Sequence, residues 1–240
     1  MSEWAVKRFW DQTHVVPAGD GFTVTLDARP LRTPAKTPLL LPTRALADLL
    51  AAEWQAQTGK IDPRVMPMTR MANSAIDKVG AQHAEVAALL AAYGETDLLC
   101  HRATAPEALI ARQAAAWDPV LDWAEQTLGV RLKVVAGVMP AEQDSVGLAR
   151  LHGRISAMDA FGLTGFHDLV SLSGSLILGF GVALGAYPAE EAWNLSRIDE
   201  DWQLEVWGHD DDAVATGRLK AAAFTDAARF YLLSQQAPSA

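Results

Sequence analysis

Hydrophobic positions near the N-terminus recur with a period of two. Residues 22–26 alternate apolar side chains with threonines, which is the pattern of a half-buried β-strand. Residues 13–16 form a second short strand candidate, and the segments 18–21 and 27–30 contain turn-forming residues. Prolines then recur every fourth residue over 30–42, and each one removes an N–H donor and restricts the residue before it. The pattern predicts a small β unit.

From residue 43 onward the apolar spacing changes to three and four, as in helices. Thr43 is a suitable N-cap for a helix over Arg44–Gln57, and Gly59 follows its expected end. Further helical stripes occupy residues 68–79, 86–93, 110–128, 148–158 and 214–231. Pro119 interrupts the third of these stripes, so we expect a kink there or a restart capped by Asp118.

Only one later segment, Arg131–Ala136, has the composition of a strand. The pattern therefore predicts an α+β protein. We expect a small β-rich N-terminal domain over residues 1–60 and a larger, mostly α-helical domain over residues 61–240.

One segment raises the alternative of a membrane span. Leu169–Tyr187 contains 19 residues without a charge, close to the ~20 apolar residues that a span requires. However, glycines and serines dilute its hydrophobicity, and its flanks are acidic rather than basic. We therefore interpret this segment as a helix buried at the centre of the helical domain.

Composition narrows the functional classes. The net charge is −9 and the pI is about 5.1, which argues against non-specific binding to nucleic acid. Cys100 is the single cysteine, which excludes an intramolecular disulfide and indicates a reducing compartment. The first residues have neither an apolar signal core nor a transit-peptide pattern, so we expect no export.

Motifs that suggest chemistry have simpler explanations. The glycines of 179–185 lie inside an apolar helical stretch rather than after a strand, so helix packing is favoured over dinucleotide binding. Cys100 and His101 are sequence neighbours without a third orienting group, which favours a buried cysteine over a nucleophile. His209-Asp210-Asp211-Asp212 could supply metal ligands, but Asp210 or Asp211 as the N-cap of the last helix explains the run better. We expect no catalytic residues, no cofactor and no metal.

The acidic residues are unevenly distributed. Nine acids and one base lie between Glu190 and Asp212, a local charge of −8. Within this stretch, Ser196–Asp199 has capping-box-like spacing and opens a predicted helix that ends near Trp207. Its core-facing stripe is expected to be Leu195, Ile198, Trp202 and Val206.

A different face of this predicted helix contains Glu200, Gln203 and Trp207. Tryptophan is enriched at binding hot spots, so an exposed tryptophan among acids suggests a partner-binding surface. The alternative is that Trp207 folds back over the helix end beside Gly208, and the residues leave both readings open.

Taken in order, a series of short motifs resembles a known family. They are Lys7-Arg8-Phe9-Trp10, the segment Leu26 to Pro34, Glu53-Trp54, Met66-Pro67-Met68-Thr69, Ala75-Ile76-Asp77, Asp97-Leu98-Leu99-Cys100, Trp117-Asp118-Pro119, Ser173-Gly174-Ser175, Asp199 to Gln203, and Trp207-Gly208. The chain resembles the assembly chaperones for the α subunit of the F-type ATP synthase head, found in mitochondria and alphaproteobacteria. The likeness runs from about Lys7 to Phe230.

The resemblance implies a non-enzymatic chaperone that binds the free α subunit before it pairs with β and promotes its assembly. The family's important acid lies in the segment that matches Asp199 to Gln203, and we assign it to Glu200. The expected partner-binding residues are Glu200, Asp199, Asp201, Gln203 and Trp207. Mitochondrial members have a cleaved presequence, and the first residues of this chain do not resemble one. We therefore expect a bacterial cytoplasmic protein, or a matrix protein if the chain is a processed eukaryotic one. We also expect it to be monomeric when free.

The residues alone are also compatible with two other functions. One is a small-molecule enzyme with a pocket in the helical domain around the Gly/Ser-rich run, near His167 and Asp168. The other is a membrane-tethered scaffold anchored through Leu169–Tyr187.

Overall fold

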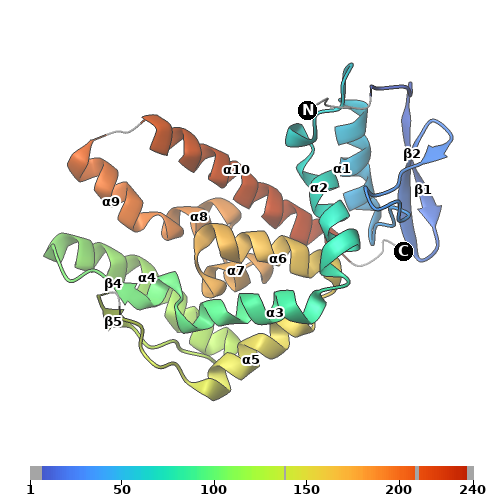
Figure 1. Ribbon diagram of the computed structural model, residues 1–240. Helices are drawn as coiled ribbons and strands as arrows, with labels where there is room; N and C mark the ends of the chain where they lie inside the picture. The colour runs from blue at the N-terminus through green and yellow to red at the C-terminus, as the bar shows by residue number, and fades with distance from the viewer. Residues whose placement is uncertain (1–6, 138, 209–210, 237–240) are drawn as a thin grey trace. The chain divides into compact units, whose positions relative to one another are not determined.

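The computed structural model describes residues 7–137, 139–208 and 211–236, and the chain forms two compact units. The first unit comprises residues 1–82, 159–165 and 229–240, and the second comprises 83–158 and 166–228. Strands precede a mostly helical remainder, as the sequence pattern predicted (Figure 1). The proposed domain bounds of 1–60 and 61–240 stay a prediction.

The first unit begins with a three-stranded antiparallel sheet. Its strands are β1 (Thr13–Ala18), β2 (Gly21–Leu26) and β3 (Arg29–Pro30), in the order β1-β2-β3. The predicted alternation in β2 is confirmed, because Val24 and Leu26 are buried. Gly21 permits a close approach of the next segment: a Cβ there would lie 2.3 Å from the carbonyl oxygen of Leu41.

Two helices follow the strands in the first unit. Helix α1 (Arg44–Gln55) packs against β1 and β2, and Thr43 Oγ1 accepts a hydrogen bond from the Leu46 N–H, which confirms the predicted N-cap. A 3₁₀ turn at Pro63–Val65 leads to α2 (Pro67–Ser74), which continues as a π-helical turn over Ala75–Val79.

Several polar side chains of the first unit form hydrogen bonds to its backbone. Arg8 donates to the carbonyl oxygens of residues 10, 11, 55 and 57, and Asp27 accepts from the N–H groups of residues 11 and 12. Glu53 accepts from the N–H groups of Met68 and Thr69, at the start of α2. These contacts join segments far apart in the sequence.

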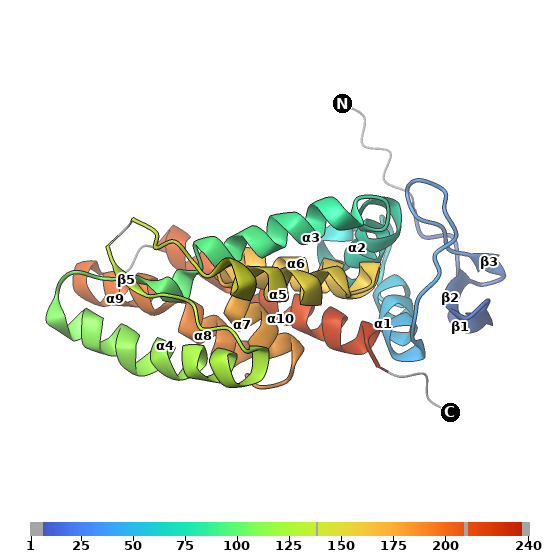
Figure 2. The same cartoon turned by 90° about the horizontal axis from the view of Figure 1, so that it is seen from below.

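The second unit is helical. Its helices are α3 (His83–Ala91), α4 (Glu107–Leu128), α5 (Ser145–Ser156), α7 (Leu176–Ala183), α8 (Ala189–Ser196) and α9 (Ile198–Trp207), while α6 (Ala160–Ser173) and α10 (Asp211–Ser234) each have residues in both units. Short 3₁₀ turns occur at Ala92–Glu95 and Leu98–Cys100. Helix α3 packs against α5, and α4 packs against α7 and α9 (Figure 2).

Helix α4 runs through Pro119 without a break, so of the two predicted alternatives, a kink or a restart, the restart is excluded. Asp118 does not cap a second helix; its carboxylate accepts a hydrogen bond from Arg102 at 2.8 Å. The buried side chains of Trp117, Val120 and Leu121 lie on both sides of the proline, and their packing compensates for the lost N–H bond.

The late strand is shorter than predicted. Only Val135–Ala136 (β5) is extended in a sheet, where it pairs in parallel with β4 (His101–Arg102). Upstream, the backbone of Lys133 is bonded instead by the Gln143 side chain, which donates to its oxygen and accepts from its N–H. A side chain therefore replaces a strand partner here.

The uncharged segment 169–187 is divided between two helices. Helix α6 ends at Ser173, Gly174 adopts a φ of 71°, and Ser175 caps α7 by accepting from Leu178 N–H. Residues 176–182 of α7 are all buried, as predicted for a central helix. Within the described ranges no helix is both long and apolar enough to cross a membrane.

Candidate partner-binding surface

Helix α9 follows α8 after a single residue, Arg197. The predicted capping role of Ser196 is wrong, because Ser196 still belongs to α8 and its hydroxyl donates to the Trp193 carbonyl oxygen. A serine inside the last helical turn bonds back to the preceding turn and cannot adopt the extended conformation of an N-cap. The predicted end of the helix at Trp207 is confirmed.

Polar contacts attach α9 to α4. Gln113 Nε2 donates to Asp199 Oδ1 at 2.6 Å. The guanidinium of Arg112 binds both carboxylate oxygens of Glu205, at 2.9 and 2.8 Å, and its Cζ lies 5.0 Å from the centroid of the Trp202 ring. These hydrogen bonds hold the pKa of Glu205 below its usual range. Charged and polar side chains therefore contribute to the contact between α9 and α4.

The apolar stripe of α9 is only partly buried. Ile198 is 8 % exposed and Trp202 is half-buried, but Val206 is 55 % exposed, so its prediction as a core residue is wrong. The C-terminal half of α9 extends beyond the side chains that would cover Val206. This end of the helix leaves apolar surface in contact with solvent.

The structure places the predicted binding residues in two groups. Glu200, Gln203 and Trp207 have the spacing of one helical face, and Trp207 is 79 % exposed. Glu200 is half-buried and accepts from Arg197 Nη1 at 2.6 Å. Asp199 is turned toward α4, where it binds Gln113, and Asp201 is exposed on the side of Arg112. The aromatic side chain of Trp207 does not fold back into a buried position.

The acidic run after α9 is only partly described. His209 and Asp210, one of the two predicted N-caps, lie outside the described residues. Asp211, the other, is not the N-cap, because it and Asp212 belong to the first turn of α10. Acidic side chains are favoured at that end of a helix. In the part of the chain that the structure describes, no group of three or more His, Cys, Asp or Glu residues is arranged to hold a metal ion.

Two glycines of the Gly/Ser-rich run, Gly179 and Gly181, pack closely against neighbouring side chains. A Cβ on Gly179 would lie 2.8 Å from Val170 Cγ2, and one on Gly181 would lie 2.7 Å from Tyr187 Cδ2. The space above both glycines is therefore filled by neighbouring side chains, as close helix packing requires. His167 Nδ1 lies 2.9 Å from Asp168 Oδ1, but both side chains are 41 % exposed on the surface.

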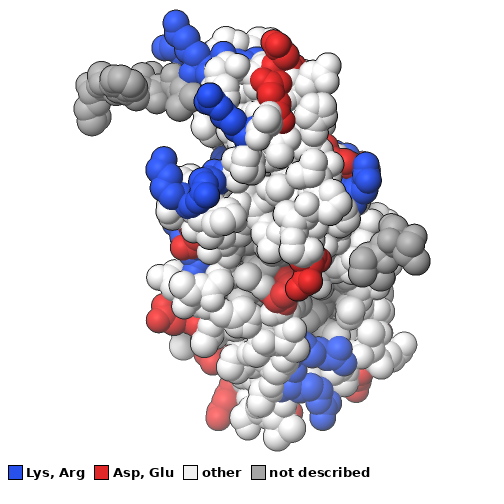
Figure 3. Space-filling view, turned by 90° about the vertical axis from the view of Figure 1, so that its right-hand side faces the viewer, with Lys and Arg blue, Asp and Glu red and all other residues white. Residues whose placement is uncertain are grey.

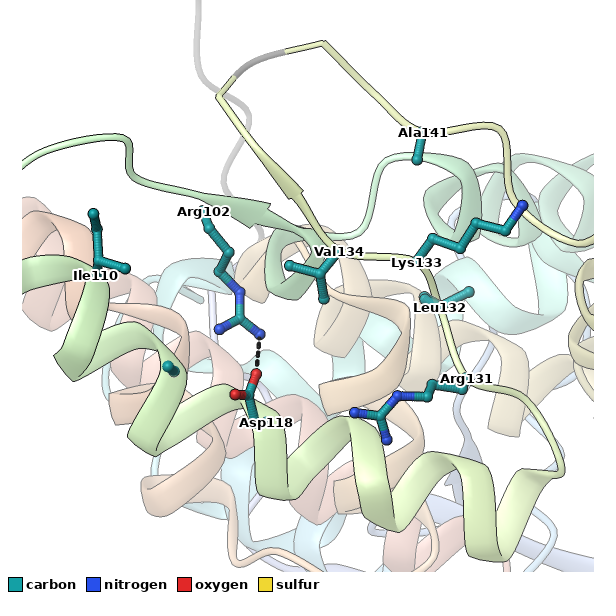
Figure 4. A pocket seen from close by; sticks show the side chains of 9 residues that line it. Arg102, Ile110, Asp118, Arg131, Leu132, Lys133, Val134 and Ala141 are labelled. Atoms are coloured by element: carbon teal, nitrogen blue, oxygen red, sulfur yellow. Dashed lines mark hydrogen bonds and ion pairs between the residues drawn. The ribbon is translucent and has the colours of Figure 1, made fainter.

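An open hollow of about 810 Å³ lies between α4 and the segment 131–134 (Figure 4). Its floor includes Ile110 and Val134, and its polar groups are already paired: Arg102 binds Asp118, and Arg131 binds Asp122 and Glu125. These charged side chains of the hollow are therefore used in contacts of the fold.

Cys100 is buried at 2 % exposure, in agreement with its interpretation as a core residue. Burial, assisted by the nearby charge of Asp97, raises the pKa of its thiol to about 12. A nucleophilic cysteine needs the opposite shift. His101 does not bind this thiol; its Nδ1 lies 3.4 Å from the Gly137 carbonyl oxygen.

The acidic charge belongs to the second unit. Its sequence ranges contain 20 Asp and Glu against 9 Lys and Arg, a net charge of −11, whereas the ranges of the first unit have a net charge of +2. On the face shown in Figure 3, basic side chains occur in small separate groups among mostly uncharged surface. The second unit is therefore the part suited to a basic partner.

Sequence reasoning did not identify Arg112 and Gln113 as part of this surface. They lie 93 and 86 residues before the carboxylates that they bind, so no local pattern connects them. The sequence indicated only that both residues lie beside the apolar stripe of residues 110–128, on a helix that must pack against other elements.

Both the sequence and the structure of this chain are similar to those of known proteins. Residues 7–125 match the model of a family described as ATP12 chaperone protein. The crystal structure of Atp12 from Paracoccus denitrificans is similar with a TM-score of 0.94 and 51 % identity, covering 97 % of this chain and 100 % of that one.

Two further proteins are similar to this chain, one in structure and one in sequence. A candidate chaperone from Agrobacterium tumefaciens has a TM-score of 0.90 and 43 % identity, covering 96 % of this chain and 86 % of that one. The mitochondrial protein atp12 of Schizosaccharomyces pombe is 26 % identical over 219 residues, which span 86 % of this chain and 75 % of that protein.

Proposed function

This chain belongs to the ATP12 chaperone family, which acts in ATP synthase assembly, and we propose that it binds the free α subunit of the F-type ATP synthase head. It would hold this subunit until β replaces it, without catalysis. The relatives are named as chaperones, which is a non-enzymatic role.

One observation carries the proposal: α9 presents Gln203 and Trp207 to solvent beside a half-buried Glu200, within the most acidic part of the chain. Exposed aromatic residues surrounded by polar groups are typical binding hot spots. The set proposed to bind the partner remains Glu200, Asp199, Asp201, Gln203 and Trp207.

The other polar motifs of the resemblance are occupied inside the protein. Asp97 accepts from Ser175 Oγ, Asp118 accepts from Arg102, and Trp117 Nε1 donates to the Leu195 carbonyl oxygen. These contacts give each of the three side chains a role in stabilising the fold. Trp207 makes no such hydrogen bond within the described residues, and its exposure to solvent supports a role in partner binding.

A subunit that waits for its partner exposes an interface that tends to aggregate. An acidic helix with an exposed tryptophan would cover the basic and apolar parts of such an interface. Charge would increase the rate and specificity of encounter, and the tryptophan would supply buried apolar area. The bacterial relatives at 51 % and 43 % identity support the proposal that this complex forms in a bacterial cytoplasm.

Co-expression with the α and β head subunits, followed by affinity capture of this chain, tests the proposal. Recovery of α without β is the expected result. Recovery of β alone, or of neither subunit with a folded bait, would contradict it.

The enzyme alternative predicts instead a small molecule that raises the melting temperature by binding the folded state. A screen of nucleotides and metabolites by thermal shift tests this alternative, and we expect no stabilising compound.

A further inference from the structure

Two guanidinium groups on the acidic surface are held in the same way, each between a carboxylate and an indole ring. Arg112 binds Glu205 with both terminal nitrogens and lies over Trp202. Arg197 binds Glu200 at 2.6 Å, and its Cζ lies 5.5 Å from the Trp193 ring centroid. This surface therefore binds arginine side chains in two separate places.

The two arginines differ in origin. Arg197 is the residue between α8 and α9, so it is fixed by the chain itself. Arg112 comes from α4 and reaches α9 only through its side chain. The Arg112 and Glu205 side chains are 40 % and 55 % exposed, and an ion pair with this exposure is weak because solvent screens the charges. A competing cation could therefore replace Arg112 at low cost.

The geometry selects for arginine. A carboxylate that accepts two parallel N–H bonds matches the planar fork of a guanidinium, and the flat group stacks on an indole. A lysine ammonium would keep the charge but lose the second bond and the stacking. Asp201 adds a further negative charge near the Arg112 guanidinium.

We propose that Trp202 and Glu205 form a binding position for an arginine side chain of the partner, which Arg112 fills in the free protein and leaves when the complex forms. This inference rests on the proposed function and adds the chemistry of the contact. Arg112 then acts as an internal competitor: it shields the acidic surface in the free protein and, by returning, favours release of the partner.

The test compares Arg112→Gln with a matched control, Arg131→Gln. Arg131 is also an exposed arginine paired with carboxylates of α4, so both variants change the net charge equally, but Arg131 does not touch α9. We expect Arg112→Gln to bind the isolated α subunit about two- to fivefold more tightly than Arg131→Gln, the factor that corresponds to an exposed ion pair. Arg112→Lys should fall between wild type and Arg112→Gln.

The opposite result is equally informative. If Arg112 is only a clamp that positions α9, Arg112→Gln will bind no more tightly than Arg131→Gln, or more weakly, and the proposal is wrong. Melting temperatures of the three variants check that each remains folded.

A second readout does not depend on the α subunit. Titration with a tetra-arginine peptide, followed by NMR of the Trp202 indole N–H, should shift this signal at lower peptide concentration in Arg112→Gln than in Arg131→Gln. Tetra-lysine should show a weaker effect. An unchanged Trp202 signal in Arg112→Gln would overturn the inference even if the wild-type protein binds α, and failure of wild type to bind α would count against the proposed function alone.

Discussion

A single buried acid links two motifs of the second unit. Asp97 is 0 % exposed, and its carboxylate accepts from the N–H groups of Leu99 and Ile177 and from the hydroxyl of Ser175. These donors lower its pKa, but burial has the larger effect and raises the pKa to about 6. Asp97 joins the turn before β4 to the start of α7.

This shift predicts a pH dependence of stability. Between about pH 4 and pH 6 the folded protein keeps the Asp97 proton while the unfolded chain has released it. Stability should therefore fall as pH rises, by roughly 1 kcal/mol per pH unit from this group. Urea unfolding at several pH values measures the slope, and Asp97→Asn should remove this part of it. Identical slopes for both proteins would contradict the assigned shift.

Cys100 is predicted to be inert in the folded protein. With its pKa raised to about 12, only about one thiol in 10⁴ is ionised at pH 8, and burial blocks access. Iodoacetamide at pH 8 should leave Cys100 unmodified over hours, whereas modification should be complete in 6 M guanidinium chloride. Equal labelling rates in the two conditions would show that the thiol is accessible.

Among the elements, those with a local apolar pattern were predictable from the sequence, and those that depend on distant pairing were not. The apolar stripe of residues 148–158 predicted the helix found as α5, in which Leu151 and Ile155 are fully buried. Helical periodicity is visible in the sequence because it is a local property. The pairing of β5 with β4 was not predictable, since it joins residues 34 positions apart (His101 with Val135). Val206 was misassigned because periodicity identifies a face of a helix but not where its covering neighbours end.

Helix α2 depends on a cap from another helix. The Glu53 carboxylate accepts from Met68 N–H at 2.7 Å and from both the N–H and the hydroxyl of Thr69. Glu53→Gln removes the negative charge at the start of the helix and one acceptor, so we expect a loss of about 1–2 kcal/mol in unfolding free energy. Denaturant titration measures it.

Asp48→Asn, a change of one exposed acid on the same helix α1, serves as the control. It should cost less than about 0.5 kcal/mol because its ion pair with Arg44 is exposed. Equal effects of the two substitutions would mean that Glu53 is not a cap.

At the scale of the whole molecule, the two units differ in net charge. The acidic stretch from Glu190 to Asp212 was visible in the sequence, and the structure puts its described part on α8, α9 and the start of α10. The sequence did not indicate which of these acids are already paired. Asp199 and Glu205 bind side chains of α4, while Asp201 stays exposed, and only the folded chain makes this distinction.

The charge of −11 on the second unit predicts salt-sensitive binding. Affinity for the α subunit should fall about three- to tenfold between 50 and 300 mM NaCl, mainly through slower association, because the Debye length shortens over this range. Surface plasmon resonance at increasing salt gives both rate constants. A constant affinity would mean that apolar contacts dominate the interface.

The central claim is that the acidic face of α9 binds the α subunit, and the affinity of Glu200→Lys for that subunit tests it most directly. The matched control is Glu85→Lys, which makes the same charge change on an exposed acid of α3. We predict that Glu200→Lys binds at least about tenfold more weakly than wild type, since a lysine there adds repulsion at the contact, while Glu85→Lys changes binding less than about twofold. Equal affinities for the two folded variants would contradict the assignment of α9 as the partner-binding surface.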